Sequence, residues 1–273
     1  MKPVVKWVGG KRQLLPDIKA RLPKNICCYY EPFIGGAALL LDLEPTNAVI
    51  NDCNEELTNL YKVIKKSPKK LIQLLEIHKQ QNSADYFYKL RNLDRTDAYK
   101  NLTDIERAAR LIYLNKVCFN GLYRVNSRGE FNSPYGKYVN PAIYSEEDIM
   151  AFHRYLRRHN IKIMTGDFTK SVRHAVEGDF VYFDPPYAPL SATSNFTSYS
   201  NIGFSATDQR RLKDTCDELN NRGVKFLLSN SNCEFIRDLY QNYTIELVDA
   251  KRSINSDASG RGKIKEVLIR NYD

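Results

Sequence analysis

The octapeptide FVYFDPPY at residues 180–187 constrains the fold more than any other stretch of the chain. Its first four residues are apolar and favour β structure, which predicts a strand buried on both faces. The prolines that follow lack the N–H donors of a β-ladder, so strand pairing must stop at Asp184. A lone Asp-Pro pair more often marks a solvated turn, but ligands of open α/β sheets bind at the carboxyl ends of buried strands. The octapeptide therefore predicts an α/β sheet with an acid at its ligand-binding edge.

An acid, two rigid residues with free carbonyls and an aromatic ring suit one reaction, the methylation of an exocyclic amine on a nucleobase. Such an amine is a poor nucleophile because its lone pair is delocalised into the ring. If the Asp184 carboxylate accepts one N–H and the Pro185 carbonyl accepts the other, the nitrogen becomes more tetrahedral and its lone pair can face an electrophilic methyl group. Pro186 keeps the turn stiff, and Tyr187 stacks on the base.

Two segments near the N-terminus have the pattern of a nucleotide-binding βαβ unit. Residues 29–38 predict a short strand, a glycine turn and the start of a helix, and Gly35 lets the backbone approach a ligand closely. Residues 48–52 predict a second strand, and its last residue, Asp52, can accept both hydroxyls of a ribose. The alternative role of Asp52 is to cap the helix that follows.

The net charge of +9 is concentrated in the middle of the chain. Residues 61–146 contain sixteen Lys or Arg against eight Asp or Glu and so carry +8 of that charge. A solvated helical surface would not confine the excess to one region, so we infer a polyanion as partner. Helical spacing over 68–80, 84–93 and 103–116 is followed by alternation on both sides of 127–129, which predicts a β-hairpin. By composition alone, a hairpin that reads a DNA groove and an ordinary exposed hairpin are equal alternatives.

Acids stand at or just past the ends of three predicted strands, a pattern typical of a Rossmann-like sheet with a cofactor laid across its top. We therefore expect an α/β fold in which residues 1–60 and 147–273 form the catalytic sheet. Residues 61–146 are expected to form an inserted helical target-recognition domain that carries the hairpin. The later strands are expected at residues 161–164 and around Phe226, Ile245 and Leu268.

The six cysteines include no C-x-x-C pair, so we expect free thiols and no metal site. The first apolar run, residues 3–8, is too short for a signal peptide, and no segment approaches the length of a membrane span. These features lead us to expect a soluble, cytoplasmic protein.

Four segments resemble amino-group methyltransferases that use S-adenosylmethionine, and among these the DNA adenine methylases of the Dam type. They are DPPY at 184–187, Phe-x-Gly at 33–35, Ala-Pro-Leu-Ser at 188–191, and the pair Asn-Gly-Leu-x-Arg-x-Asn and Gly-x-Phe-Asn-x-Pro within 120–134. The resemblance covers nearly the whole chain, and the order of cofactor motif, recognition region and catalytic tetrapeptide is that of the alpha group. It implies S-adenosyl-L-methionine as the cofactor and double-stranded DNA as the substrate.

The resemblance also implies which residues meet the cofactor. Trp7 and Lys11 line its pocket, and Asp167 or Phe168 lies beside its adenine. The expected cofactor-binding set is Trp7, Lys11, Phe33, Gly35, Asp52, Asp167, Phe168 and Asp184.

For the DNA, the resemblance implies that Arg124 reads guanine and that Leu122 and Pro134 contact thymine. Phe119 is the intercalating aromatic residue; part of the family has a tyrosine here, whose hydroxyl is absent from this chain. Further DNA contacts are expected toward the bases from Lys6 and Asn120, and toward the phosphates from Arg95, Asn126, Lys137 and Ser191.

The expected function is methyl transfer to N6 of adenine in double-stranded DNA, with GATC as the implied target and the adenine flipped out of the duplex. We expect a monomer or weak dimer on DNA, of bacterial or phage origin. The same tetrapeptide could serve an RNA adenine, a DNA cytosine or a glutamine side chain, but Asp in the first place favours adenine and the basic hairpin disfavours glutamine. A DNA-binding module with a dead site would have lost the acid or the aromatic ring, and both are present.

Overall fold

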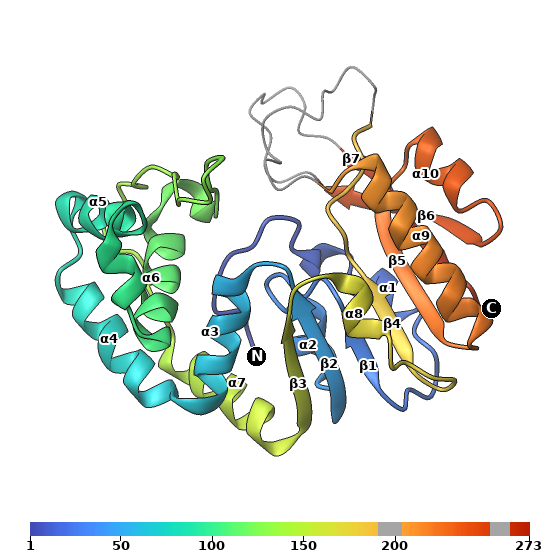
Figure 1. The fold of residues 1–273 in the computed structure, drawn as a ribbon, viewed down its shortest axis with the longest axis horizontal. Coiled ribbons are helices and arrows are strands. Elements are labelled where there is room, and N and C mark those ends of the chain that lie inside the picture. The colour runs from blue at the N-terminus through green and yellow to red at the C-terminus, as the bar shows by residue number, and fades with distance from the viewer. Residues whose placement is uncertain (191–203, 252–262) are drawn as a thin grey trace. The chain divides into compact units, whose positions relative to one another are not determined.

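The computed structural model describes residues 1–190, 204–251 and 263–273. The chain forms two compact units, which we describe separately (Figure 1). The first unit consists of residues 1–10, 34–46 and 51–166, and the second of residues 11–33, 47–50 and the described part of 167–273. The first unit contains the whole of the expected recognition segment, residues 61–146, and extends beyond it. The domain boundaries drawn from the sequence therefore stay a prediction.

Within the described ranges, seven strands form one sheet in the order β3-β2-β1-β4-β5-β7-β6. Strand β1 pairs in parallel with β2 and β4, and β4 pairs in parallel with β5. Strand β7 runs antiparallel to both β5 and β6. This arrangement confirms the expected Rossmann-like α/β fold. The strands are β1 Tyr29–Glu31, β2 Asn47–Asp52, β3 Asn160–Thr165, β4 Phe180–Phe183, β5 Lys225–Ser231, β6 Thr244–Lys251 and β7 Lys263–Arg270.

Strand β4 is the buried strand that the octapeptide predicts. All four of its residues are buried, and it lies between two parallel neighbours. Its pairing ends at Phe183, directly before Asp184 and the two prolines. Around it, the apolar core of the second unit includes Phe226 and Leu228 of β5. The tetrapeptide at residues 184–187 thus leaves the carboxyl end of a central strand.

Helices cover this core in the second unit. The longest, α9, starts at a capping box in which the Ser205 hydroxyl accepts from the Asp208 N–H and the Asp208 carboxylate accepts from the Ser205 N–H. It ends before Gly223, whose φ of 71° lies in the left-handed region. The helices of this unit are η1 Lys11–Gln13, α1 Leu15–Lys19, α8 Phe168–Val172, α9 Ala206–Asn221 and α10 Glu234–Leu239.

The first unit is mainly helical, and α6 packs against α3, α4 and α5 (Figure 1). The three helices predicted over 68–80, 84–93 and 103–116 are confirmed to within a residue at each end. Local signals explain this accuracy, since Pro68 stands at the first position of α4 and Thr103 forms a capping box with Glu106. The helices are α2 Ala38–Leu43, α3 Glu55–Lys66, α4 Pro68–Gln80, α5 Ala84–Asn92, η2 Leu93–Arg95, η3 Asp97–Asn101, α6 Asp104–Val117, η4 Phe119–Gly121 and α7 Glu146–Arg158.

The predicted hairpin is present as a short antiparallel turn. Val125 and Phe131 form an isolated bridge, the Asn126 N–H donates to the Glu130 carbonyl at 2.9 Å, and Gly129 has a φ of 79°. A second bridge joins Cys118 and Tyr135. Across the described residues, no helix is long and apolar enough to cross a membrane.

Candidate active site and nucleic-acid interface

The Asp184 carboxylate is half-buried, with a side chain 18% exposed, and it is paired. Its Oδ1 accepts from the Ser229 hydroxyl at 2.9 Å and lies 2.8 Å from Lys11 Nζ. Burial raises the pKa of the Asp184 carboxyl, while the Lys11 ammonium and the Ser229 hydroxyl oppose that rise. An unpaired carboxylate would be costly to bury, so Lys11 and Ser229 allow a charged group to remain at the end of β4.

The Tyr187 side chain has one partner at its hydroxyl and another over the face of its ring. Its hydroxyl donates to Glu266 Oε2 at 2.6 Å, and Lys11 Nζ lies 4.5 Å from the ring centroid. Burial, together with the nearby Asp184 and Glu266 charges, raises the Tyr187 pKa well above its ordinary value, so the phenol stays protonated. The aromatic ring therefore has a fixed position beside the carboxylate.

The carbonyls of Pro185, Pro186 and Ala188 in this turn differ in their partners. The Pro186 carbonyl accepts from Gln209 Nε2 at 2.9 Å, and the Ala188 carbonyl accepts from the Ser231 hydroxyl at 2.7 Å. The Pro185 carbonyl accepts no hydrogen bond from residues 1–190, 204–251 or 263–273. Among the described residues, the Asp184 carboxylate is therefore followed directly by a carbonyl that has no hydrogen-bond donor.

In the second unit, three phenylalanine rings form an apolar wall near the end of β1. Phe33 lies 5.3 Å from Phe168 and 5.5 Å from Phe204, centroid to centroid. Asp167 caps α8 by accepting from the Thr169 N–H at 3.0 Å, and it pairs with Arg211 at 2.8 Å. Burial raises the pKa of Asp167, but the hydrogen bonds from Thr169 and Arg211 outweigh it, and the pKa lies below its usual value.

In the first unit, the Asp52 carboxylate is oriented by two backbone donors. Oδ2 accepts from the Gly35 N–H at 3.0 Å, and Oδ1 accepts from the Asn54 N–H at 2.9 Å. Burial raises the Asp52 pKa despite these donors. The N-cap of α3 is Asn54, whose side chain accepts from the Leu57 N–H, so the alternative role of Asp52 as the cap is wrong.

Gly35 lies in close contact with Trp7. A Cβ at this position would lie 3.0 Å from Trp7 Cδ1, and Gly35 has a φ of 45°, so a side chain would be strained here. The Gly35 carbonyl accepts from the Tyr61 hydroxyl. The glycine is thus fixed by Trp7, Asp52 and Tyr61, all within the first unit.

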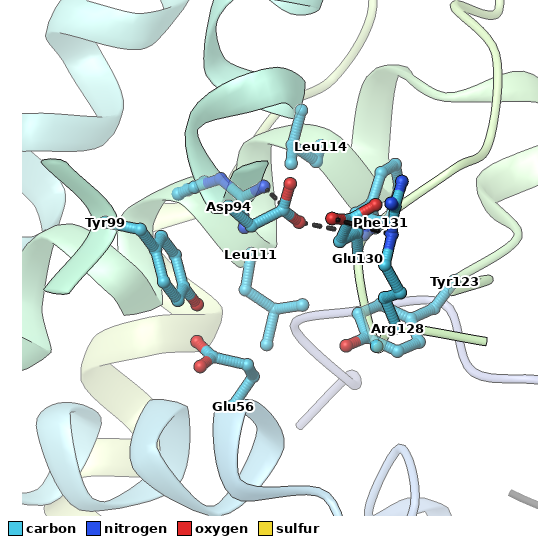
Figure 2. A pocket seen from close by; sticks show the side chains of 11 residues that line it. Glu56, Asp94, Tyr99, Leu111, Leu114, Tyr123, Arg128, Glu130 and Phe131 are labelled. Carbon is cyan, nitrogen blue, oxygen red and sulfur yellow. Dashed lines mark hydrogen bonds and ion pairs between the residues drawn. The ribbon is translucent and has the colours of Figure 1, made fainter. Parts of the chain in front are cut away.

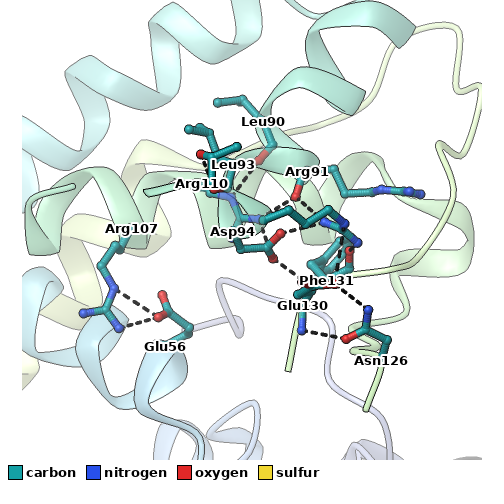
Figure 3. A network of polar contacts seen from close by, with 12 residues as sticks. Glu56, Leu90, Arg91, Leu93, Asp94, Arg107, Arg110, Asn126, Glu130 and Phe131 are labelled. Carbon is teal, nitrogen blue, oxygen red and sulfur yellow. Dashed lines mark hydrogen bonds and ion pairs between the residues drawn. The ribbon is translucent and has the colours of Figure 1, made fainter. Parts of the chain in front are cut away.

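A polar network joins the hairpin to the helices (Figure 3). The Asp94 carboxylate accepts from the Phe131 N–H at 2.8 Å and pairs with Arg110 at 2.8 Å. Arg95 donates to the Phe131 carbonyl at 2.8 Å and pairs with Asp94 at 2.6 Å. This network sets the position of the hairpin strand that starts at Phe131.

A cavity of about 220 Å³ lies beside this network, and its walls belong wholly to the first unit (Figure 2). Tyr99, Leu111 and Tyr123 line it together with Glu56 and the hairpin. Glu56 is itself paired with Arg107 (Figure 3). The cavity holds none of the expected catalytic or cofactor residues.

Arg124 differs from its neighbours in its partners. Its Nε donates to Asn132 Oδ1 at 2.7 Å, and among the described residues it has no acidic partner. Arg128, in contrast, lies 3.3 Å from Glu130 and has a side chain 76% exposed. Arg124 is thus oriented by an amide and keeps its charge available.

Several expected DNA contacts share one exposed part of the hairpin region. The Phe119 side chain is 56% exposed, and the Phe119 N–H donates to the carbonyl of exposed Pro134 at 2.8 Å. Asn120 is exposed and has a φ of 57°. The backbone of Lys6 is held by the Asn115 side chain, which accepts from the Lys6 N–H and donates to the Lys6 carbonyl. The structure therefore brings Phe119, Asn120 and Pro134 together. Of the rest, Leu122 is half-buried, Lys137 is exposed, and Ser191 lies outside the described residues.

Two of the expected phosphate contacts have partners inside the protein. Arg95 belongs to the Asp94 network, and Asn126 closes the hairpin turn by donating to Glu130 Oε2 at 2.6 Å and accepting from the Glu130 N–H at 3.0 Å. Their role toward DNA stays a prediction.

Comparison with known proteins now identifies the chain. The family described as D12 class N6 adenine-specific DNA methyltransferase matches residues 7–254. The chain belongs to this family. It is 49% identical over 272 residues to the Type II methyltransferase M1.LlaDCHI of Lactococcus lactis subsp. cremoris. The aligned region covers 100% of this chain and 96% of that relative.

Two further relatives span similar lengths. The Type II methyltransferase M.MjaIII of Methanocaldococcus jannaschii is 42% identical over 293 residues, covering 100% of this chain and 99% of the relative. The DNA adenine methylase of Escherichia coli K12 is 34% identical over 266 residues, covering 97% and 93%. The protein is thus an adenine-specific DNA methyltransferase that uses S-adenosyl-L-methionine.

The residues of this D12 methyltransferase fit a nucleoside cofactor. The Asp52 carboxylate, which accepts hydrogen bonds from Gly35, Asn54 and Cys53, offers charged acceptor oxygens to a hydroxyl donor. Gly35, also in the first unit, offers backbone without a side chain. Taken by itself, the second unit offers an apolar wall for a base, formed by Phe33 and Phe168. Within the described ranges, no group of His, Cys, Asp or Glu is arranged to hold a metal ion.

Five residues that support the catalytic turn of this D12 methyltransferase do not follow from the sequence interpretation. They come from α9, β5 and β7, and all but Glu266 are buried. The apolar run of β5 ends in a polar triplet, Ser-Asn-Ser, which was a usable signal because it stands at the carboxyl end of a buried strand. The residues are Gln209, Ser229, Asn230, Ser231 and Glu266.

Proposed function

We propose that this methyltransferase modifies the adenine of GATC in double-stranded DNA after flipping that base out of the helix. The observation that supports the chemical part most strongly is a pair of adjacent acceptors beside the fixed ring of Tyr187. They are the Asp184 carboxylate and the Pro185 carbonyl, to which no described residue donates. An adenine amine has two hydrogens to donate and a ring to stack, so the acceptors match it in number and kind.

In this proposal, Asp184 accepts one amine hydrogen and Pro185 accepts the other. The nitrogen then becomes more tetrahedral, and its lone pair is freed from the ring for reaction. S-adenosyl-L-methionine, when bound, supplies a methyl group that is already electrophilic because of its sulfonium. After transfer, the amine carries a surplus proton that it loses readily, so Asp184 can act as acceptor without being a strong base.

Base flipping costs a few kcal/mol, because the target adenine must leave its stack and its partner. Tyr187 offers a ring on which the flipped adenine stacks, which offsets part of that cost. Phe119, exposed beside the hairpin, offers an aromatic wedge for the space that the adenine leaves. Tyr187 would therefore act on the flipped adenine, and Phe119 would act in the space that the adenine leaves in the duplex.

The cofactor roles carried from the resemblance are part of this proposal. Asp52 accepts the ribose hydroxyls, and Asp167 or Phe168 lies beside the cofactor's adenine. The remaining cofactor contacts are assigned to Trp7, Lys11, Phe33 and Gly35.

The recognition of the DNA sequence is supported by Arg124, which has no acidic partner among the described residues. Arg124 donates from Nε to Asn132 Oδ1 and from Nη2 to the Asn132 carbonyl at 3.4 Å, which leaves Nη1 and the second hydrogen of Nη2 to donate to O6 and N7 of guanine. Leu122 and Pro134 are assigned to thymine, and Lys6 and Asn120 to the neighbouring bases. Arg95, Asn126, Lys137 and Ser191 are assigned to phosphates, with the protein acting as a monomer or weak dimer on DNA.

The test is transfer of a tritiated methyl group from S-adenosyl-L-methionine to duplexes that differ at one base pair of GATC. We expect each single replacement to cost about 1 to 3 kcal/mol in kcat/KM, or roughly 5- to 150-fold. Equal rates on GATC and all its single variants would refute the proposed target while leaving the adenine-specific activity intact.

A further inference from the structure

Buried polar side chains tie the backbone of the catalytic turn at three points. Gln209 Nε2 donates to the Pro186 carbonyl at 2.9 Å, the Ala188 N–H donates to Asn230 Oδ1 at 3.0 Å, and the Ser231 hydroxyl donates to the Ala188 carbonyl at 2.7 Å. The side chains come from the first turn of α9 and from the last two residues of β5. Gln209 is 1% exposed and Asn230 is fully buried.

The two amides also bond to each other and form a relay. Asn230 Nδ2 donates to Gln209 Oε1 at 3.1 Å. The backbone groups at the two ends fix the orientation of both amides, because a carbonyl can only accept and an N–H can only donate. Gln209 must therefore present its NH₂ to Pro186, and Asn230 must present its oxygen to Ala188. The relay has one orientation, so it holds residues 186–188 in one conformation.

This arrangement decides which carbonyl is available to a ligand. The relay and Ser231 occupy the carbonyls of Pro186 and Ala188, whereas no described residue donates to the carbonyl of Pro185. We propose that Gln209 and Asn230 are positioning residues that aim the Pro185 carbonyl at the second amine hydrogen of the target adenine. The inference rests on the proposed role of Asp184 and Pro185 in the reaction.

Stability alone does not explain the relay. Two buried carboxamides gain only a modest net free energy from their hydrogen bonds, and apolar side chains of the same shape could fill the space at similar stability. A relay with satisfied ends instead restricts the conformation of what it binds. Here it binds the residues directly after the acceptor, where an error of 1 Å can cost about 100-fold in rate.

Two substitutions at Gln209 separate positioning from packing. Gln209→Glu keeps the size and the acceptor for Asn230 but, when ionised, has no donor for the Pro186 carbonyl. Gln209→Met keeps the approximate size and removes both bonds. Thr215→Val is the matched control, because Thr215 is a buried residue of the same helix whose hydroxyl donates to the Arg211 carbonyl, away from the turn.

Each variant is assayed for thermal stability, for the Kd of S-adenosyl-L-methionine and of a GATC duplex, and for the single-turnover rate of methyl transfer. We expect both Gln209 variants to lose about 10- to 100-fold in rate, with both Kd values within about 3-fold of the parent. Thr215→Val should lower the thermal stability and leave the rate within about 3-fold.

A second measurement addresses the amine directly. The Kd is compared for duplexes that carry adenine or purine at the target position, with S-adenosylhomocysteine bound in place of the cofactor. Purine lacks the amine, so the parent should favour adenine, and Gln209→Met should reduce that preference several-fold while Thr215→Val preserves it.

The inference is overturned if folded Gln209→Glu and Gln209→Met keep the parental rate and the parental preference for adenine over purine. It is also overturned if their losses only match that of Thr215→Val. Failure of the proposed function is a different result, namely a folded Asp184→Ala variant that methylates at the parental rate. An inactive Asp184→Ala variant beside fully active Gln209 variants would refute the positioning role alone.

Discussion

Replacing Arg124 by alanine should relax the reading of guanine without abolishing DNA binding. The guanidinium is oriented by its 2.7 Å hydrogen bond to Asn132, and it has no acidic partner among the described residues. No described acidic residue therefore neutralises the charge of Arg124. Arg128, four residues further on, is paired with Glu130 and mostly exposed, so it serves as a matched control on the same hairpin.

The expected magnitude follows from this geometry. A bidentate arginine–guanine contact contributes about 1 to 3 kcal/mol of discrimination, which corresponds to roughly 5- to 150-fold in affinity. Arg124→Ala should lose that amount on a GATC duplex and much less on a duplex whose guanine is already replaced. Arg128→Ala breaks only an exposed ion pair, so it should change either affinity by about 1 kcal/mol at most, and equally for both duplexes.

The assay is a double comparison at one salt concentration, with both variants measured on matched and mismatched duplexes by competition. A ratio of affinities that falls only for Arg124→Ala supports its role as the guanine reader. Equal losses on both duplexes would show that Arg124 only positions the DNA, and the reader would have to be sought at Lys6, Arg128 or Asn120.

Three further variants test the cofactor site, a phosphate contact and the catalytic pair. Asp52→Ala should weaken the binding of S-adenosyl-L-methionine by about 1.5 to 3 kcal/mol, because the two ribose hydroxyls lose an ionised acceptor. An affinity that calorimetry finds unchanged would assign the ribose contact to another residue. Lys137→Ala should weaken all duplexes alike and reduce the slope of log affinity against log salt by about 0.9, whereas an unchanged slope would exclude a phosphate contact. Burial raises the Asp184 pKa and Lys11 opposes that rise, so Lys11→Met should raise the pKa further and move the acid limb of the pH–rate profile to higher pH. An acid limb that does not move would show that this limb does not report Asp184.

The parts of the fold that were predictable from the sequence are those with local causes. Strand β4 ends where prolines remove its donors, and α4 and α6 begin at a proline and a capping box. Each of these signals lies within a few residues of the boundary that it sets. The same holds for the short hairpin turn at Gly129.

The parts that were not predictable depend on partners far apart in the chain. Gln209 meets the turn 23 residues away, and Glu266 meets Tyr187 across 79 residues. No local pattern marks a polar residue in the first turn of a helix, such as Gln209 in α9, as a partner of a distant loop. In the same way, a basic side chain such as Arg95 looks available for DNA in the sequence, although in the fold it donates to the Phe131 carbonyl, 36 residues away. Side-chain types indicate what a residue can bind, and the fold decides which partner it meets.

The most direct test of the account is the single-turnover rate of Asp184→Ala on a GATC duplex, measured with tritiated S-adenosyl-L-methionine. The Kd values for the duplex and the cofactor are determined on the same folded preparation, and Asp184→Asn serves as the isosteric comparison. We predict that methyl transfer is abolished in Asp184→Ala and nearly so in Asp184→Asn, while the duplex affinity stays close to that of the parent. A transfer rate near the parental value in folded Asp184→Ala would contradict the mechanism.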